Sequence, residues 1–262
     1  MRRLYVGEPL EEGRAVALDG ADAHRVARVL RLRPGERIAL FDGSGREAVA
    51  ELVAVSPRRV EARVVTVGDG LPEPPVRLVL YQAVVKGERF AWALEKGTEV
   101  GVARFVPLLA GRSVVRTGEG AKLERWRRIV IEATEQCGRA VPPVVTPPAT
   151  FDEALPSLEP PALVAFEGEE AVGLGDALDA VALPPGGTLR LIIGPEGGFA
   201  PEEVSRAVTR GAQPVSLGPR ILRSETAGVV ASALALARLG GFEPLRRAKD
   251  RTPRTSTGPD RR

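Results

Sequence analysis

The chain has 262 residues, of which 44% are hydrophobic and 27% charged. This balance is typical of a folded globular protein and excludes a disordered or membrane-spanning chain. No apolar run is long enough for a signal peptide or a membrane helix, which predicts a cytoplasmic protein. The single cysteine, Cys137, excludes an internal disulfide. With one histidine, His24, it cannot form a Cys/His zinc site, so we expect no metal.

The composition also avoids thermolabile side chains. Asparagine is absent, and there are three glutamines, one methionine and many more arginines than lysines, a profile typical of thermophilic proteins. The formal net charge is only +3, but arginines gather near the N-terminus at Arg25, Arg28, Arg31, Arg33 and Arg37. Clustered arginine is typical of a phosphate-backbone binder, and a solvated basic face explains it equally well.

Residues 1–70 predict a small β-rich domain. Strand-like runs at 14–18, 37–41, 48–53 and 60–65 are separated by turn signals. One helix is expected over 22–30, with Val26, Val29 and Leu30 on its inner face. A proline-rich linker over 71–75 marks the domain boundary.

From residue 76 to 243 strands alternate with helices, which predicts an α/β domain with a mostly parallel sheet covered on both faces. Strands are expected at 76–85, 105–109, 163–166, 189–193 and 214–217. Helices are expected at 88–99, 123–135, 201–210 and 225–239, with Ser224 as the N-cap of the last. The basic tail over 244–262 is expected to be disordered.

Two glycine-containing turns follow predicted strands and open predicted helices. Residues 193–199 read Ile-Gly-Pro-Glu-Gly-Gly-Phe, and residues 217–227 read Leu-Gly-Pro-Arg-Ile-Leu-Arg-Ser-Glu-Thr-Ala. Ligands bind at the carboxyl ends of strands in open α/β sheets, so two such turns indicate a shared pocket. In that pocket Ile221 and Leu222 would pack on an adenine. The alternatives are a ligand-free turn and ordinary buried anchor residues.

Other nucleotide signatures are absent from the sequence. It has no Gly-x-x-x-x-Gly-Lys-Ser/Thr string and no Gly-x-Gly-x-x-Gly that opens a βαβ unit. Since these loops bind the phosphates of nucleotides and dinucleotides, their absence disfavours a phosphate-using enzyme and a Rossmann-type methyltransferase.

The two turns resemble the signature of the RsmE family, the 16S ribosomal RNA uracil-N3 methyltransferases of the SPOUT superfamily. Further landmarks occur in the same order: His24 with 29–31, Lys86 with 96–101, Pro107 with 112–113, and Trp126 with 132–136 and Arg139. The resemblance extends to about residue 243. It implies an N-terminal PUA-like RNA-binding β-barrel, a C-terminal SPOUT-type domain with a trefoil knot, and a homodimer.

The resemblance also implies the ligands and the residues that bind them. The methyl donor is S-adenosyl-L-methionine, and the partner is 16S ribosomal RNA within the small ribosomal subunit. The donor-binding positions are Phe166, Gly194, Pro195, Glu196, Gly197, Gly198, Leu217, Gly218, Ile221, Leu222 and Thr226. Lys86, Lys96 and Glu99 are placed by the resemblance alone, and structural ion pairs are the alternative for them.

Methylation at uridine N3 requires loss of a weakly acidic proton and stabilisation of the anion that develops. Our hypothesis gives the second task to Arg223, with Arg112 and Arg139 as alternatives. Glu135 or Glu225 would accept the proton, although either carboxylate could equally cap a helix or form a salt bridge.

The N-terminal arginines fit contact with RNA phosphates. His24, Arg25, Arg28 and Arg31 are the predicted contacts, which would position RNA without reading its sequence. For His24, capping or packing of its own helix is the alternative. A noncatalytic RNA-binding ribosome-assembly factor that kept the fold is the alternative function for the whole chain.

Overall fold

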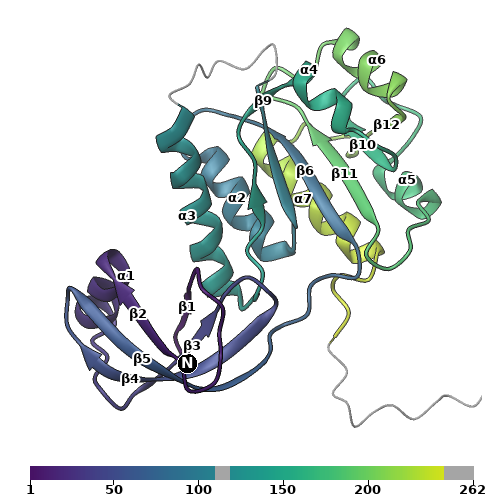
Figure 1. Ribbon diagram of the computed structural model, residues 1–262. Coiled ribbons are helices and arrows are strands. Elements are labelled where there is room, and N and C mark those ends of the chain that lie inside the picture. Colours follow the sequence, from purple (N-terminus) through teal and green to yellow (C-terminus); the bar gives the residue numbers. More distant parts are fainter. Residues whose placement is uncertain (110–118, 245–262) are drawn as a thin grey trace, which may run out of the picture.

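The computed structural model describes residues 1–109 and 119–244, which form two sheets with separate hydrophobic cores (Figure 1). The N-terminal sheet has five strands and the C-terminal sheet has seven. In Figure 1 the N-terminal sheet lies beside one end of the long helix α3 (Glu119–Cys137). Most of the predicted tail, and the predicted site residue Arg112, lie outside the described residues.

The N-terminal sheet is a curled half-barrel in which the two edge strands do not pair. Its order is β1-β3-β4-β5-β2, with β1 at Arg3–Tyr5, β2 at Ala15–Asp19, β3 at Arg37–Phe41, β4 at Arg46–Val55 and β5 at Arg59–Asp69. Register shifts between β4 and β5 bend the sheet, because a bulge strengthens the local twist. Strand β1 was not predicted; it has three residues and pairs in parallel with β3.

The helix predicted over 22–30 is divided in two. Helix α1 spans Gly20–His24, and a π-helical turn, η1, spans Arg25–Val29. The Leu30 amide donates to the Arg25 carbonyl five residues earlier, which widens the turn. Val26 is buried as predicted, but Val29 is 67% exposed. The prediction for Val29 was therefore wrong, because it assumed α-helical periodicity through the widened turn.

The C-terminal sheet is entirely parallel, which confirms the predicted α/β class. Its order is β12-β10-β11-β6-β7-β8, and β9 also pairs with β7. The strands are β6 (Arg77–Ala83), β7 (Arg104–Leu109), β8 (Val144–Val145), β9 (Ala149–Thr150), β10 (Ala162–Ala165), β11 (Thr188–Ile193) and β12 (Ala212–Val215). Strands β8 and β9 were not predicted, because each has only two residues and so shows no periodicity in the sequence.

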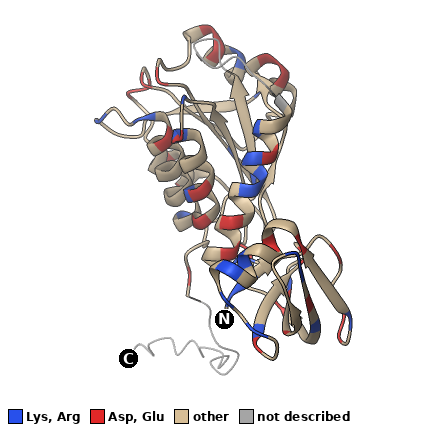
Figure 2. Cartoon of the chain, turned by 90° about the vertical axis from the view of Figure 1, so that its left-hand side faces the viewer, with Lys and Arg blue, Asp and Glu red and all other residues tan. Residues whose placement is uncertain are grey.

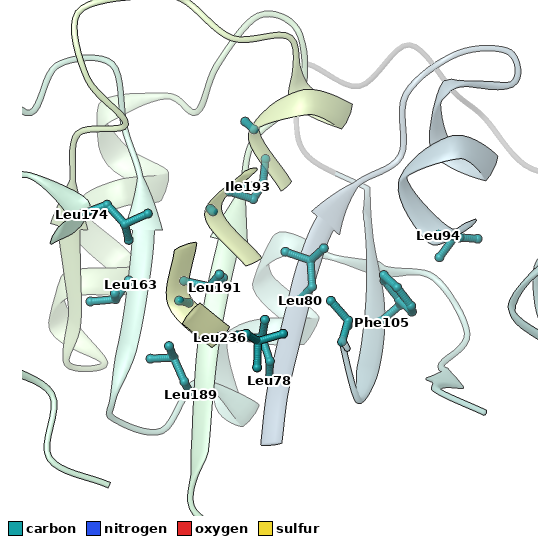
Figure 3. Packing of buried hydrophobic residues seen from close by; sticks show 14 of the residues in the cluster. Leu78, Leu80, Leu94, Phe105, Leu163, Leu174, Leu189, Leu191, Ile193 and Leu236 are labelled. Atoms are coloured by element: carbon teal, nitrogen blue, oxygen red, sulfur yellow. The ribbon is translucent and has the colours of Figure 1, made fainter. Parts of the chain in front are cut away.

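Helices cover both faces of this sheet. Helices α2 (Arg89–Val100), α3, α5 (Leu174–Ala180) and α7 (Ser224–Arg238) share one core. Helix α4 (Phe151–Ala154), the 3-10 turn η2 (Leu155–Ser157) and α6 (Pro201–Thr209) cover the other. Strand residues alternate between the two cores, as a pleat requires: Leu191 enters the first and Ile192 the second. Figure 3 shows side chains of β6, β7, β10 and β11 that fill the first core.

Candidate functional site

A cavity of about 810 Å³ lies at the carboxyl ends of three neighbouring strands, β10, β11 and β12. Three loops line it, those at 165–170, 193–199 and 216–224, together with Ala227 of α7. The volume lies within the range of about 300–1,000 Å³ that is typical of small-molecule sites. Both glycine-containing turns therefore face one cavity.

One hydroxyl group joins the two turns. Ser224 Oγ donates to the Gly194 carbonyl oxygen at 2.5 Å and accepts from Gln82 Nε2 at 2.9 Å. Gly194 belongs to the first turn and Ser224 ends the second, while Gln82 lies near the end of β6. Ser224 was predicted as the N-cap of the last helix, but the N-cap is Arg223. The Ser224 hydroxyl is thus free to link segments that lie thirty residues apart.

Helix α7 approaches β6 so closely that one position requires glycine. A Cβ atom on Gly228 would lie 2.0 Å from Gln82 Oε1, a separation that buried atoms do not tolerate. The close approach brings the start of α7 within reach of Gln82, which is itself 1% exposed. Gln82 and Gly228 therefore determine where the second turn lies.

The turns themselves use glycine for different reasons. Gly194 allows close packing, since a Cβ there would lie 3.1 Å from the buried Phe199 ring. Gly218 has φ +98, a conformation that L-residues with side chains rarely adopt. The path of the backbone in both turns therefore depends on glycine.

Charged and apolar side chains surround the opening. Arg220 and Arg223 are exposed on the loop before α7, and Ile221 between them is 85% exposed. The structure therefore does not support the alternative that Ile221 is a buried anchor. Glu196 pairs with Arg89 Nη1 at 3.2 Å, which links the first turn to α2.

The structure brings nearly all of the predicted donor-binding residues together. Thr226 is the exception: it lies half-buried on α7, and the next residue, Ala227, lines the cavity in its place. The residues that do line the cavity are Phe166, Gly194, Pro195, Glu196, Gly197, Gly198, Leu217, Gly218, Ile221 and Leu222. The wall extends beyond the predicted Phe166 to Glu167–Glu170, a segment that was not predicted because it has no helical or strand periodicity.

The predicted catalytic residues separate into two groups. Arg223 lines the cavity. Glu135 and Arg139 lie at the opposite, amino edge of the sheet, where Arg139 donates to the carbonyl oxygens of Thr98 and Val102 at 2.8 and 2.9 Å. Because α3 runs antiparallel to the strands, its last turn is carried away from the cavity by the strand length of about 20 Å. The structure therefore does not unite Glu135 and Arg139 with Arg223.

Glu225 lies in the first turn of α7, where a negative charge is favoured by the helix dipole. Its side chain is buried, and within the described part of the chain its Oε2 atom has no hydrogen-bond partner. Glu225 does not line the cavity in the structure. It is nevertheless the buried carboxylate nearest in sequence to Arg223.

Three of the four predicted RNA contacts are exposed: His24, Arg28 and Arg31. Arg31 closes the π-helical turn with φ 54, in the left-handed region. Arg25 differs, because its Nη1 atom pairs with Glu135 Oε2 at 2.6 Å. Among the described residues, no hydrogen bond or ion pair engages the side chains of His24, Arg28 and Arg31.

Of the three residues placed by resemblance alone, Lys96 and Glu99 contact each other, and Lys86 lies apart from them. Lys96 contacts Glu95 and Glu99 at 2.8 Å each, and these hydrogen bonds raise the pKa of Lys96 to about 12. Lys96 and Glu99 therefore form the structural ion pair that was the alternative for them. Lys86 is exposed in the loop before α2.

Two properties of the described residues concern metals and membranes. Residues 1–109 and 119–244 hold no group of three or more His, Cys, Asp or Glu residues arranged to bind a metal ion. Within the same ranges, no helix is both long and apolar enough to cross a membrane.

Comparison with known proteins identifies the two parts of the chain. Residues 18–65 match the RNA methyltransferase PUA domain, and residues 72–236 match the RNA methyltransferase domain. Ribosomal RNA small subunit methyltransferase E of Bacillus subtilis (strain 168) is 33% identical over 241 residues, which cover 88% of this chain and 94% of that protein. The chain belongs to the RsmE family of RNA methyltransferases.

Solved structures agree with the RsmE assignment. A ribosomal RNA small subunit methyltransferase E from Neisseria gonorrhoeae, bound to S-adenosyl methionine, has a TM-score of 0.80 and 35% identity over 89% of this chain and 95% of its own. A putative methyltransferase from Legionella pneumophila, in complex with the same cofactor, has a TM-score of 0.83 and 33% identity over 90% and 96%. The predicted SPOUT-type and PUA-like folds are thereby confirmed.

The bridge between the turns leads to a first prediction. Ser224→Ala removes the donor to the Gly194 carbonyl and leaves Gln82 Nε2 without its closest acceptor, so we expect a loss of about 1–3 kcal/mol in the free energy of unfolding. Amide hydrogen exchange should accelerate in both turns and not in the N-terminal sheet. Ser205→Ala is the control, because that hydroxyl only contacts a carbonyl of its own helix. Equal protection of the turns in both variants would contradict the bridging role.

Proposed function

We propose that this protein transfers a methyl group from S-adenosyl-L-methionine to N3 of one uridine in 16S ribosomal RNA. The observation that carries the proposal is the single cavity lined by both glycine-containing turns. Membership of the RsmE family supports the reaction class, and the cofactor in two related structures supports the donor.

The residues of the cavity fit such a donor. Backbone groups of 194–198 and 217–222 would bind its adenine and ribose, and the half-buried Phe166 ring and the exposed Ile221 offer apolar surface for the adenine. Glu167 and Glu170 lie on the loop at 165–170, which also lines the cavity. Their carboxylates would attract the positively charged sulfonium and ammonium groups of the donor. When bound, the donor supplies an electrophilic methyl group.

The remaining chemistry belongs to the chain itself. Arg223 lies on the cavity wall, where its guanidinium would hold the uridine and stabilise negative charge as the N3 proton leaves. We place the proton acceptor at Glu225, directly or through water, because its buried carboxylate begins the same helix. The cavity walls would restrict how the base can approach, so that its N3 atom is held in line with the methyl group of the donor.

RNA binding is proposed for the N-terminal domain, residues 1–70. His24, Arg28 and Arg31 would contact phosphates there, and such contacts position RNA without reading bases. The uridine, within the small ribosomal subunit, would have to be splayed out from structured RNA to reach the cavity. A linker at 71–75 separates this domain from the catalytic domain at 76–243.

We further propose a homodimer and a trefoil knot. The outer face of α7 is apolar, with Val230 37% and Leu234 51% exposed, and its sequence has no charge between Glu225 and Arg238, which suits contact with a second copy. Helix α7 follows the edge strand β12 but packs on β6 and β11. The chain therefore returns from the edge of the sheet to its middle after β12, as it must do if its C-terminal part passes through a loop to form a knot.

The cellular setting is also part of the proposal. An enzyme of small-subunit RNA would act in the cytoplasm, where ribosomal subunits are assembled. The absence of asparagine and the abundance of arginine ion pairs support a thermophilic source.

The direct test uses unmodified small ribosomal subunits and isotopically labelled S-adenosylmethionine. Mass spectrometry of the digested RNA should find the label on N3 of a single uridine. Label on another base or on ribose would refute the proposed specificity. Donor binding without any transfer would favour the noncatalytic assembly factor instead.

Arg223→Ala tests the catalytic assignment. Loss of a donor aimed at a developing anion reduces kcat by on the order of 10²-fold, while donor affinity measured by calorimetry should change little. Arg210→Ala is the control, because Arg210 is an exposed arginine at the other end of the preceding helix. An unchanged kcat in the Arg223 variant would remove this residue from the mechanism.

Arg28→Ala tests the phosphate contacts. Each lost contact reduces the slope of log affinity against log salt by about 0.7–0.9. We expect that change together with weaker RNA binding and an unaltered affinity for S-adenosylmethionine. A slope equal to that of the wild type would show that Arg28 does not contact phosphate.

A further inference from the structure

The joint between the N-terminal sheet and the C-terminal layers is built on one buried carboxylate. Glu135, near the end of α3, is 7% exposed. Its Oε2 accepts from Arg25 Nη1 at 2.6 Å, and its Oε1 accepts from the Tyr5 backbone amide at 3.0 Å. Arg25 begins η1 and Tyr5 ends β1. The two oxygens of Glu135 therefore hold two separate elements of the N-terminal domain.

Both partners have a local reason to need this carboxylate. Strand β1 is an edge strand, so the Tyr5 amide has no neighbouring strand to bond to on its outer side. An amide left without a partner at a covered joint is costly. Arg25 lies at the start of the widened helical turn, whose i to i+5 bond fixes its backbone. Glu135 therefore satisfies the outer amide of β1 and pairs with an arginine whose backbone is fixed by its own helical turn.

A second contact lies just beyond the end of α3, at Arg139, two residues after Cys137. The Arg139 carbonyl oxygen accepts from Arg3 Nη2 at 2.9 Å, and the Arg139 guanidinium pairs with Glu73 of the connector. Glu135 and the Arg139 carbonyl are therefore two separate anchor points at the end of α3. Two anchor points fix the direction of α3 relative to the N-terminal sheet, whereas one point would leave it free to tilt.

Orientation matters because the RNA-contacting surface and the cavity lie far apart. Figure 2 shows acidic and basic residues meeting where α3 reaches the N-terminal sheet, and the cavity lies at the other edge of the C-terminal sheet. With a strand length of about 20 Å as the lever arm, a tilt of about 10° at the joint displaces the far end by on the order of 3 Å. Displacements of that size disrupt near-attack geometry.

We propose that Glu135 is a positioning residue, which holds the N-terminal domain at the angle that delivers RNA to the cavity. This inference rests on the proposed function for its kinetic consequences, but not for its structural ones. It also gives Arg25 a different task from Arg28: Arg25 holds the joint, while Arg28 remains free to contact RNA. A charge pair with a buried carboxylate suits this task, because its hydrogen bonds accept only a narrow range of geometry.

The test compares Glu135→Gln with wild type. Glutamine keeps the size of the side chain and an acceptor for the Tyr5 amide, but it removes the charge that pairs with Arg25. The matched control is Glu124→Gln, which removes an exposed pair with Arg127 at 2.7 Å within the same helix. Circular dichroism establishes that each variant is folded, and Arg25→Gln serves as a second variant if Glu135→Gln is not.

The structural readout is the distance between two spin labels, one on each side of the joint. Ser56→Cys places a label on the turn between β4 and β5, and Ser205→Cys places one on exposed α6, in a Cys137→Ala background. We expect a narrow distance distribution in wild type and in the Glu124 variant. It should broaden in the Glu135 and Arg25 variants, and the double variant should resemble either single one, because one interaction is lost in all three.

The kinetic readout is kcat/KM for the RNA, which we expect to fall by about tenfold in Glu135→Gln with an unchanged affinity for S-adenosylmethionine. A distribution as narrow as that of wild type would overturn the inference. Tighter RNA binding with a narrow distribution would overturn it too, since Arg25 would then be a phosphate contact released from Glu135. If wild type methylates no RNA but the distribution broadens, the proposed function fails while the positioning role of Glu135 stands.

Discussion

The cavity depends on the hydroxyl of Ser224, which holds the first turn to the second. One hydrogen bond to the Gly194 carbonyl and one from Gln82 connect the ends of β6, β11 and the start of α7. Each partner is itself constrained, Gln82 by the close approach of α7 at Gly228 and Gly194 by the Phe199 ring. Loops are usually the least ordered part of an α/β domain. Here a buried polar network supplies the order that a ligand site needs.

The same architecture separates chemistry from RNA docking. Parallel strands place the cavity at their carboxyl edge, whereas the antiparallel course of α3 brings Glu135 to the amino edge, where the N-terminal sheet attaches. Binding energy gained from RNA on the half-barrel can assist the reaction only through a rigid connection. The charge pair at the end of α3 provides that connection.

The parallel sheet and the two cavity-lining turns could be predicted from the sequence, because their local patterns agree with the fold. Alternating strands and helices predict the parallel sheet, and glycines after two of the strands predict the two turns. Other features depend on tertiary contacts. Nothing local marks the three-residue β1 or the widening of η1, so Val29 was placed inside. Glu135 carries the same local signal whether it faces a substrate or Arg25, and only the path of α3 decides between them.

The proposed function requires the two turns to enclose the methyl donor between them. A crystal structure of the protein soaked with S-adenosylmethionine would show whether they do. We expect the donor between residues 194–198 and 217–222, with Ser224 still bonded to the Gly194 carbonyl. A donor bound elsewhere on the chain, or a cavity that stays empty, would refute the proposed function.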